Sequence, residues 1–363
     1  MNVHVKRFVA VAAAVSLAAG LAACGDTGES DERSLTIGVL SPGPADRRWL
    51  DFDEPLIAEA IKKLCGDCTV DAAEAQDSPV AQQQQVDTMI INGVDVIVLI
   101  PVDARSIGAS VQRAHQANIP VVAYDRLAEG PVSAYVSFDN VEVGRVQGEA
   151  LLKALGDRPD GAQIVMMNGS DTDPNSASFE KGALSALKGR VKIGRSYNTP
   201  EWRTDVARAN MSGAIASLGP DGIDGVYAAS DGLATGIVSA LKAANVKPFP
   251  PITGQDAELS ALQRIVAGEQ YMTVYKNFKV QADAAAKLAL ALGRGESIDD
   301  LAKESVSSRT VEDIPAVLLS PVSVTVDNVD TVVKDGLYTI EQICTSRYRT
   351  ACEEASLLAG SRS

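Results

Sequence analysis

The sequence predicts an α/β protein of two doubly wound lobes, each built on a parallel sheet with helices on both faces. Short runs rich in β-branched residues alternate with helical patterns from Ser34 onward, which is typical of parallel sheets. The same alternation starts again at residue 162. The 363 residues also exceed the roughly 100 to 200 residues of one ordinary domain, so two lobes are expected.

The first lobe is predicted from nearly continuous apolar strands separated by helices. In chain order, we expect a strand at 35–40, a helix at 54–64, a strand at 94–100, a helix at 106–117 and a strand at 121–124. The glutamine run at 82–85 most simply belongs to a helix that leads to the apolar residues 89–91.

The second lobe repeats this pattern, and the two lobes join near residues 137–141. Its predicted strands lie at 162–167, 191–197, 225–229, 252–254 and 271–274. Its predicted helices lie at 176–187, 204–218, 233–244 and 258–267.

The end of the chain is expected to return to both lobes. A long helix at 280–292 precedes a strand-like tail at 316–333. Several crossings between lobes would form a hinge rather than a single loose linker. We therefore predict an N-terminal lobe of 34–138 plus 277–319 and a C-terminal lobe of 139–276 plus 320–335. The tail at 336–363 follows them.

The amino terminus has the pattern of an export signal. Residues 1–23 run from Lys6 and Arg7 through an apolar stretch that is short for a membrane span, and they end in small residues before Cys24. The ending Leu-Ala-Ala-Cys resembles a bacterial lipobox, in which the cysteine is lipidated; a plain signal peptide is the alternative. Residues 24–33 are polar and suit a tether.

The four remaining cysteines fall into two close pairs. Export places them in an oxidising compartment, where local pairing of Cys65 with Cys68 and of Cys344 with Cys352 is the economical arrangement. A redox role for the C-x-x-C sequence and a zinc site are the alternatives.

Charge and histidine content exclude several functions. The formal charge of −14 disfavours nucleic acid as a partner. The two histidines, His4 and His115, leave almost nothing for a Ser-His-Asp triad or a multi-histidine zinc site. The chain also has no phosphate-binding loop for ATP, and no cofactor or metal is predicted.

Polar and aromatic residues follow the predicted strands, where open parallel sheets bind ligands. Each residue alone has an ordinary explanation as a loop, a surface ion pair or a helix cap, but agreement at eight strand ends is harder to obtain by chance. These residues are Asp46, Arg47, Arg48 and Trp49, then Asp125 and Arg126, Asp139 and Asn140, 171–175, Trp202 and Arg203, Ser230 and Asp231, Gln255 and Asp256, and Lys276.

A cleft with these contents suits a neutral polyol. Fixed carboxylates, amides and guanidinium groups can pair with each hydroxyl, while an indole covers the apolar face of a pyranose. An unpaired buried hydroxyl costs about 1 to 3 kcal/mol, so such a site discriminates between sugars.

Four segments carry a resemblance that covers about residues 34–333. They are 122–126 (VAYDR), 136–140 (VSFDN), 254–257 (GQDA) and 272–276 (MTVYK). With these segments the sequence resembles the type I periplasmic sugar-binding proteins of ABC importers, and among them the D-xylose-binding components. The resemblance implies that the protein is a monomer that binds a monosaccharide, with a pentose favoured, and delivers it to an ABC permease.

The resemblance also implies roles for particular residues. Trp49 and Trp202 would flank the sugar. The hydrogen-bonding residues would be Arg48, Asp125, Arg126, Asn140, Asp231, Asp256 and Lys276, with Arg47 and Asn175 as further candidates. This chain has Ser230-Asp231 where the family usually has Asn-Asp, so one hydroxyl contact would be lost or made through water.

Two other functions are compatible with the same residues. The sugar-bound protein, closed about its hinge, could engage a chemoreceptor or a histidine kinase as a sugar sensor. An exported sugar enzyme could instead use acids such as Asp125, Asp139, Asp231 and Asp256, although Arg126 and Lys276 are placed to keep such acids ionised.

Overall fold

The structure is a computed structural model that describes residues 34–44, 47–156 and 161–358. Within these residues, the first sheet has seven strands in the order β10-β11-β5-β4-β3-β1-β2. Its pairs are parallel except that of β10 with β11. The strands are β1 (Thr36–Ser41), β2 (Thr69–Glu74), β3 (Val96–Leu99), β4 (Val121–Tyr124), β5 (Ala134–Phe138), β10 (Glu304–Val306) and β11 (Ile314–Leu319).

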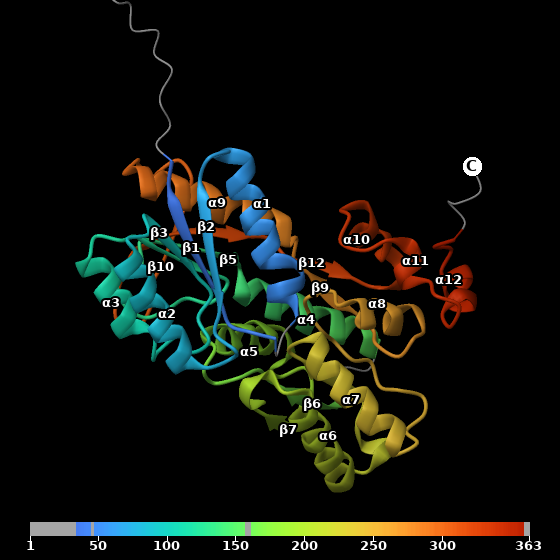
Figure 1. The fold of residues 1–363 in the computed structure, drawn as a ribbon. Coiled ribbons are helices and arrows are strands. Elements are labelled where there is room, and N and C mark those ends of the chain that lie inside the picture. Colours follow the sequence, from blue (N-terminus) through green and yellow to red (C-terminus); the bar gives the residue numbers. More distant parts are fainter. Residues whose placement is uncertain (1–33, 45–46, 157–160, 359–363) are drawn as a thin grey trace, which may run out of the picture. The chain divides into compact units, whose positions relative to one another are not determined.

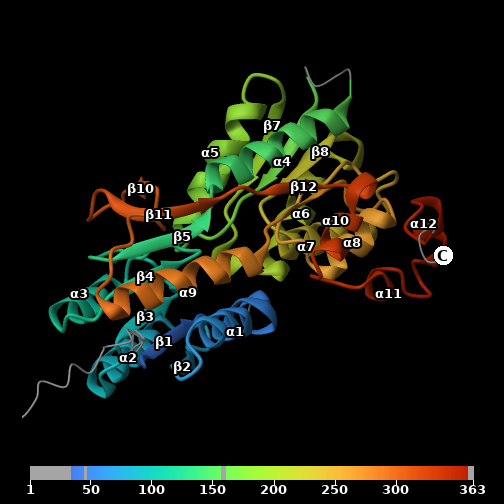
Figure 2. The same ribbon diagram turned by 90° about the horizontal axis from the view of Figure 1, so that it is seen from above.

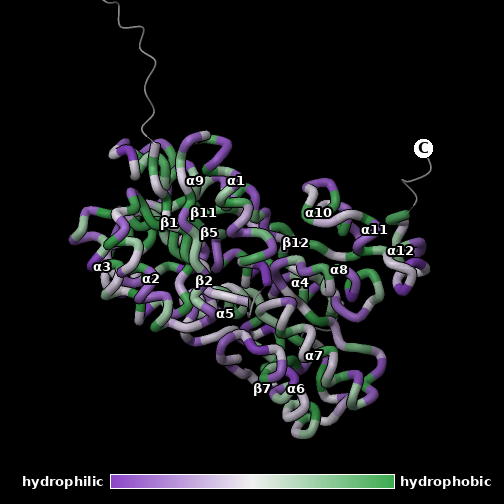
Figure 3. The backbone as a smooth tube through the Cα atoms, viewed as in Figure 1, coloured by the Kyte–Doolittle hydropathy of each residue, from purple (hydrophilic) through white to green (hydrophobic). Residues whose placement is uncertain are grey.

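Helices cover both faces of this sheet (Figures 1 and 2). Helices α1 (Glu54–Leu64) and α9 (Phe278–Arg294) form a core with one face, and α2 (Pro79–Asn92) and α3 (Gly108–Gln116) form a core with the other. Strands β3 and β4 are buried along their whole length, which explains why their sequences, VIVL and VVAY, are hydrophobic throughout. Figure 3 shows the corresponding hydrophobic stretches along the strands of this sheet.

A second sheet has the order β7-β6-β8 and is parallel. It contains β6 (Gln163–Met167), β7 (Lys192–Tyr197) and β8 (Gly225–Ala228). Single parallel bridges from Val226 to Ile252 and from Gln255 to Val274 extend it toward β9 (Thr273–Tyr275), which pairs antiparallel with β12 (Val322–Val324).

Four helices build the core around the second sheet. They are α4 (Asn140–Leu155), α5 (Pro174–Leu187), α6 (Thr204–Leu218) and α7 (Asp231–Ala243). Helix α4 packs on α5 and helix α6 on α7. Gly144 and Gly182 allow the first pair to touch, since a Cβ at either position would lie 1.9 Å from a carbonyl oxygen of the other helix.

The chain passes between these two regions three times. It leaves the first sheet between β5 and α4, returns between β9 and α9, and leaves again between β11 and β12. The predicted fold class is therefore confirmed. Within the described ranges, no helix has the length and apolar character needed to cross a membrane. The predicted leader, tether and lipidated Cys24 lie outside the described residues.

The prediction of a strand-like segment at 316–333 is wrong for its second half. Strands β11 and β12 account for the residues up to Val324, but η4 (Val326–Asn328) and α10 (Asp330–Lys334) are helical. A capping box between Thr325 and Asn328 starts this helical segment. Helix α8 (Leu259–Val266) then packs against the C-terminal helices α11 (Ile340–Ile343) and α12 (Arg349–Glu354) in a separate apolar cluster.

Both predicted cysteine pairs are joined as disulfides. Cys65 pairs with Cys68 and Cys344 with Cys352. Cys65, Asp67 and Cys68 could together offer ligands to a metal ion, but the disulfide occupies both sulfurs.

Candidate functional site

Arg48 lies at the centre of a buried cluster of charged groups. It precedes η1 (Trp49–Asp53), a turn of π-helix that follows the loop after β1, and its side chain is 6% exposed. Its Nε lies 2.8 Å from Asp53 Oδ2, its Nη2 2.9 Å from Asp125 Oδ2 and its Nη1 3.3 Å from Asp256 Oδ1. One guanidinium group therefore joins residues that follow strands of both sheet regions.

Asp256 links Arg48 to Lys276. The Nζ of Lys276 lies 2.7 Å from Asp256 Oδ1, and the lysine side chain is 4% exposed. Asp256 follows the bridge residue Gln255, and Lys276 follows β9. The ends of two adjacent extended segments therefore bring a carboxylate and an ammonium group together, as parallel-sheet topology predicts.

Asp173 joins Arg126 to Trp202. Its Oδ2 lies 2.9 Å from Arg126 Nε, a contact that is an ion pair rather than an aligned hydrogen bond. The same oxygen accepts a hydrogen bond from Trp202 Nε1 at 3.2 Å. Its Oδ1 caps α5 by accepting from the backbone N–H of Asn175 at 2.9 Å. The carboxylate thus fixes a cation and an indole at the start of α5.

Two asparagines complete the connection between the two regions. Asn175 Nδ2 donates to the backbone oxygen of Asp125 at 3.0 Å, and Asn140 Nδ2 donates to Asn175 Oδ1 at 2.9 Å. The cluster therefore holds nine of the eleven predicted ligand-binding residues. They are Arg48, Trp49, Asp125, Arg126, Asn140, Asn175, Trp202, Asp256 and Lys276.

The two tryptophans lie in different surroundings. Trp49 is 2% exposed, and the guanidinium carbons of Arg48 and Arg126 lie 4.5 and 5.3 Å from its ring centroid. Trp202 is partly exposed and meets Phe179 edge-on at 6.3 Å. Both indoles therefore border the charged cluster.

The backbone is strained at three of these residues. Asp125, Trp202 and Asp256 have φ values of 61°, 55° and 90°, in the left-handed region that residues other than glycine rarely adopt. Such conformations cost about 1 to 3 kcal/mol each and cluster at functional sites. Contacts elsewhere in the fold therefore hold these three residues in strained conformations.

Burial and ion pairing set the charges of the carboxylates. Burial alone would raise the pKa of Asp125, but Arg48, Lys276 and Arg126 outweigh it and lower the pKa to about 2. Burial raises the pKa values of Asp53 and Asp173 above that of a free aspartate, against the opposing effects of Arg48 and Arg126 respectively. Asp125 is thus a fixed hydrogen-bond acceptor at neutral pH.

Arg47 lies apart from the cluster. Its side chain is 78% exposed and forms an i,i+4 ion pair with Asp51 at 2.8 Å. Consecutive residues at a helix start point in different directions, so only one of the two neighbouring arginines can face the interior. The structure assigns that position to Arg48.

Asp231 also lies apart from the cluster, because its carboxylate is fully buried among residues of its own region. It accepts hydrogen bonds from Gln270 Nε2 at 2.7 Å, from Thr273 Oγ1 at 2.7 Å and from the backbone N–H of Glu258 at 3.0 Å. Asp231 therefore supports the segment that carries Asp256 and does not meet the charged cluster directly.

Burial raises the pKa of Asp231 to about 7, although Arg264 and the hydrogen bonds from Thr273 and Gln270 lower it. When the pKa of a carboxyl group is higher in the folded than in the unfolded protein, the group stabilises the fold fully at a pH below its unfolded pKa of about 3.9. This stabilisation decreases as the pH rises toward the pKa of the folded protein.

For Asp231 we therefore expect the free energy of unfolding to fall between pH 4 and 7. In Asp231→Asn this fall is smaller by up to about 1.4 kcal/mol per pH unit. Urea unfolding at pH 4, 5.5 and 7 measures it, and parallel curves for the two proteins would contradict it.

Several members of the cluster were not predicted. Asp53, Phe179, Phe278 and Gln281 lie inside helical segments, where they resemble ordinary core or surface positions. Asp173 lies in the predicted strand-end stretch 171–175, and its place before Pro174 marks it as a helix cap. The sequence therefore indicates that Asp173 caps a helix, but it does not indicate that the same carboxylate also contacts Trp202.

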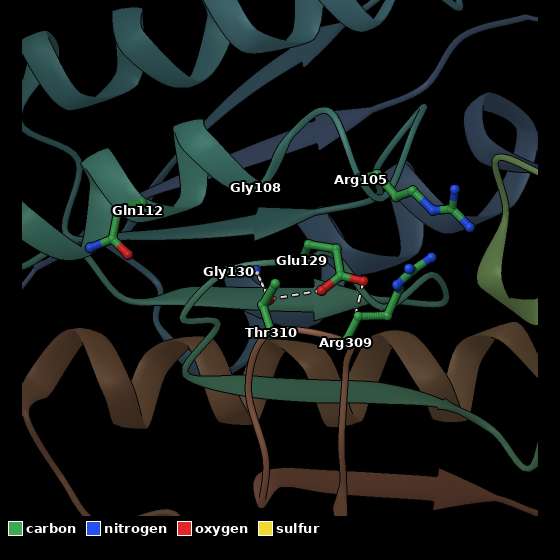
Figure 4. A pocket seen from close by; sticks show the side chains of 7 residues that line it. All are labelled: Arg105, Gly108, Gln112, Glu129, Gly130, Arg309 and Thr310. Carbon is green, nitrogen blue, oxygen red and sulfur yellow. Dashed lines mark hydrogen bonds between the residues drawn. The ribbon is translucent and has the colours of Figure 1, made fainter.

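A surface pocket of about 430 Å³ lies elsewhere on the first sheet's side of the chain (Figure 4). Its lining contains none of the predicted ligand-binding residues, and Glu129 there already accepts hydrogen bonds from Thr310 and Arg309. We assign the candidate site to the buried cluster, because its charged groups are desolvated and come from both regions. The pocket is lined by Arg105, Gly108, Gln112, Glu129, Gly130, Arg309 and Thr310.

Comparisons with known proteins show the family to which the chain belongs. Residues 37–297 match the family model described as periplasmic binding protein domain. The D-xylose-binding periplasmic proteins of Haemophilus influenzae and Escherichia coli are each 33% identical, over 86% and 84% of this chain and 92% of theirs. A solved ABC transporter solute-binding protein from Clostridium phytofermentans, with bound β-D-glucose, is 28% identical with a TM-score of 0.79. This match covers 85% of this chain and 99% of that one.

Proposed function

The chain belongs to the periplasmic binding protein family, and on that premise we propose that it captures a neutral monosaccharide outside the cytoplasm for an ABC importer. The proposal is carried by one observation. Arg48 of the first region, held by Asp53 and Asp125, reaches Asp256 of the second region in a buried site. Such a site has hydrogen-bonding groups for a ligand on both sides.

The charge balance of the site favours a neutral ligand. Its three cations, Arg48, Arg126 and Lys276, each already have a carboxylate partner within 3.0 Å. An anionic sugar would have to displace one of these partners and leave it buried without its counter-charge. A hydroxyl group can instead accept from a cation and donate to a carboxylate without breaking the charge pairing.

We assign the sugar contacts to the nine clustered residues. The carboxylates accept from sugar hydroxyls, the asparagine amides accept or donate, and the arginines and Lys276 donate. Trp49 and Trp202 cover the apolar faces of the ring. Asp231 acts as a support for Asp256, and Arg47 has no contact in this assignment.

Capture is proposed to proceed by hinge closure. The two lobes are 34–138 with 277–319 and 139–276 with 320–335, and they turn about the segments where the chain crosses between sheets. Sugar shifts the equilibrium toward the closed form only by the contacts that it makes in that form alone. Residues such as Arg48 and Asp256, which meet across the two regions, supply those contacts.

D-Xylose is the favoured ligand. The two D-xylose-binding relatives support a pentose, while the glucose-bound structure shows that this architecture also holds a hexose. Ser230 stands where the family usually has asparagine, and its hydroxyl is used to cap α7, accepting from Leu233 N at 3.3 Å. It therefore offers less to a sugar hydroxyl than the longer amide would.

The proposal extends to the cell surface. Lipidation of Cys24 would anchor the protein to the membrane through the tether 24–33, and the closed monomer would deliver its sugar to a permease. Globomycin treatment of producing cells tests the anchor, because it should lead to accumulation of the uncleaved precursor. Normal processing would argue for a plain signal peptide.

Isothermal titration calorimetry tests the binding function. D-Xylose, D-glucose, D-ribose and myo-inositol are titrated into the mature protein, and we expect at least one aldose to bind with 1:1 stoichiometry, with D-xylose tightest. Small-angle scattering should show a smaller radius of gyration with the bound sugar. Absence of heat and of compaction across this panel would refute the proposal.

A further inference from the structure

An aromatic contact joins the C-terminal segment to the element that follows Arg48. We propose that this contact is a latch that slows release of the sugar from the closed form. The C-terminal segment is residues 335–358, and the latch is Tyr338, Phe52 and Phe278. The inference rests on the proposed function, since a latch of this kind acts on a bound sugar.

The C-terminal segment is attached to the second region. Gln263 Nε2 of α8 donates to the backbone oxygen of Gln342 at 2.9 Å, and Ile343 and Cys352 are buried in the apolar cluster that α8 shares. The disulfide between Cys344 and Cys352 closes the segment on itself. Both ribbon views show α11 beside α8 (Figures 1 and 2). The segment therefore moves with the second region.

Tyr338 of this segment meets Phe52, which belongs to the first region. The two rings are perpendicular, at 88°, and their centroids lie 5.8 Å apart, the edge-to-face geometry that aromatic pairs prefer. Phe52 lies in η1, which packs against α1 and α9 of the first sheet. The pair thus joins two parts of the chain that hinge closure would move against each other.

The contact continues to the centre of the site. Phe52 also packs on Phe278 at 5.8 Å, and the guanidinium carbon of Arg48 lies 4.3 Å from the Phe278 ring. Arg48 in turn reaches Asp256 of the second region. Tyr338 is therefore a positioning residue, which acts on Arg48 through two rings and does not touch the sugar.

The position of these rings determines the expected effect. The Tyr338–Phe52 contact is present in the form in which Arg48 reaches Asp256. If separation of the regions breaks it, the contact stabilises the closed form alone, and its loss accelerates opening. The free energy of one aromatic pair corresponds to about a 2- to 10-fold change in a rate or equilibrium constant.

Stopped-flow kinetics with D-xylose, or with D-glucose if calorimetry identifies that sugar, tests the latch. We expect Tyr338→Ala to raise the sugar dissociation rate about 2- to 10-fold while the association rate stays within 2-fold of wild type. Tyr338→Phe keeps the ring and should retain the wild-type rate. Tyr348→Ala is the matched control, because Tyr348 packs on the same apolar cluster with its ring against Arg347.

The outcomes separate the latch from the proposed function. If wild-type protein binds the sugar and Tyr338→Ala releases it at the wild-type rate, the latch is refuted and sugar capture stands. Equal acceleration in Tyr338→Ala and Tyr348→Ala would assign the effect to lost packing and also refute the latch. A double-mutant cycle with Phe52→Leu should show non-additive dissociation rates, and additive ones would refute the pairing. If wild-type protein binds none of the sugars, the proposed function itself fails.

Discussion

Replacing Arg48 with methionine is expected to lower the free energy of unfolding at pH 7 by about 3 to 5 kcal/mol, the cost of breaking a buried ion pair by removing one partner. The arginine side chain is 6% exposed, and its partners Asp53 and Asp125 are 0% and 7% exposed. Methionine fills a similar volume but leaves both carboxylates without their nearest cation. Urea unfolding measures the loss, and the same variant should bind no sugar in calorimetry.

Two controls separate this effect from the loss of any arginine. Arg145→Met removes an exposed arginine that pairs with Glu142 and Glu149 on α4, and it should cost at most about 1 kcal/mol. Arg48→Lys keeps the charge but loses the guanidinium fork that reaches three carboxylates, so an intermediate loss is expected. A destabilisation of Arg48→Met no larger than that of Arg145→Met would show that the cluster does not depend on its central cation.

The sequence predicted the helices with regular apolar spacing and missed those with unusual composition. Residues 54–64 and 204–218 are helical with the expected bounds. Helix α4 was missed because Gly144 and Gly148 interrupt its pattern and lower its intrinsic helix propensity. The structure shows why glycine is needed there, since the α5 backbone occupies the space that a side chain would take. Only tertiary contact supplies that reason.

Edge strands and the tail were missed for other physical reasons. Strand β2 lies at one edge of the first sheet and is half-buried, so its sequence TVDAAE lacks the apolar run of the central strands. The valines of the tail were read as a strand because of their β propensity. Val329 and Val332 instead have helical spacing and are fully buried against the C-terminal helices.

The rule that ligand-binding residues follow the strands of an open parallel sheet predicted most residues of the charged cluster, but not which of them pair with each other. It selected Arg48, Asp125, Asp256 and Lys276 because each follows an extended segment, and the structure brings them together. It could not decide which of Arg47 and Arg48 faces the interior, since the direction of each side chain depends on the residue at which the following helical turn begins. It also included Asp231, whose hydrogen bonds to Gln270 and Thr273 depend on contacts distant in sequence.

Trp202→Ala is expected to weaken sugar binding about 30- to 1000-fold, the effect of losing an aromatic residue that dominates a binding site. The indole is held on three sides. Its Nε1 donates to Asp173, its ring packs on Phe179 at a steep angle, and its rim lies so close to Gly169 that a Cβ there would be 2.2 Å away. A ring fixed in this way loses little entropy when it covers a sugar.

Calorimetry of three variants tests whether this fixed ring contacts the sugar. Trp202→Phe keeps an aromatic face but loses the hydrogen bond to Asp173, so its affinity should lie between those of wild type and Trp202→Ala. Gly169→Ala should also weaken binding, because a Cβ at this position would lie 2.2 Å from the indole and 2.4 Å from Ser176 Oγ and would displace the indole. Since Trp49 is the other of the chain's two tryptophans, its fluorescence in Trp202→Ala reports whether the first region still folds. Wild-type affinity in a folded Trp202→Ala protein would mean that the sugar binds elsewhere, and the charged cluster would then lose its assignment as the pocket.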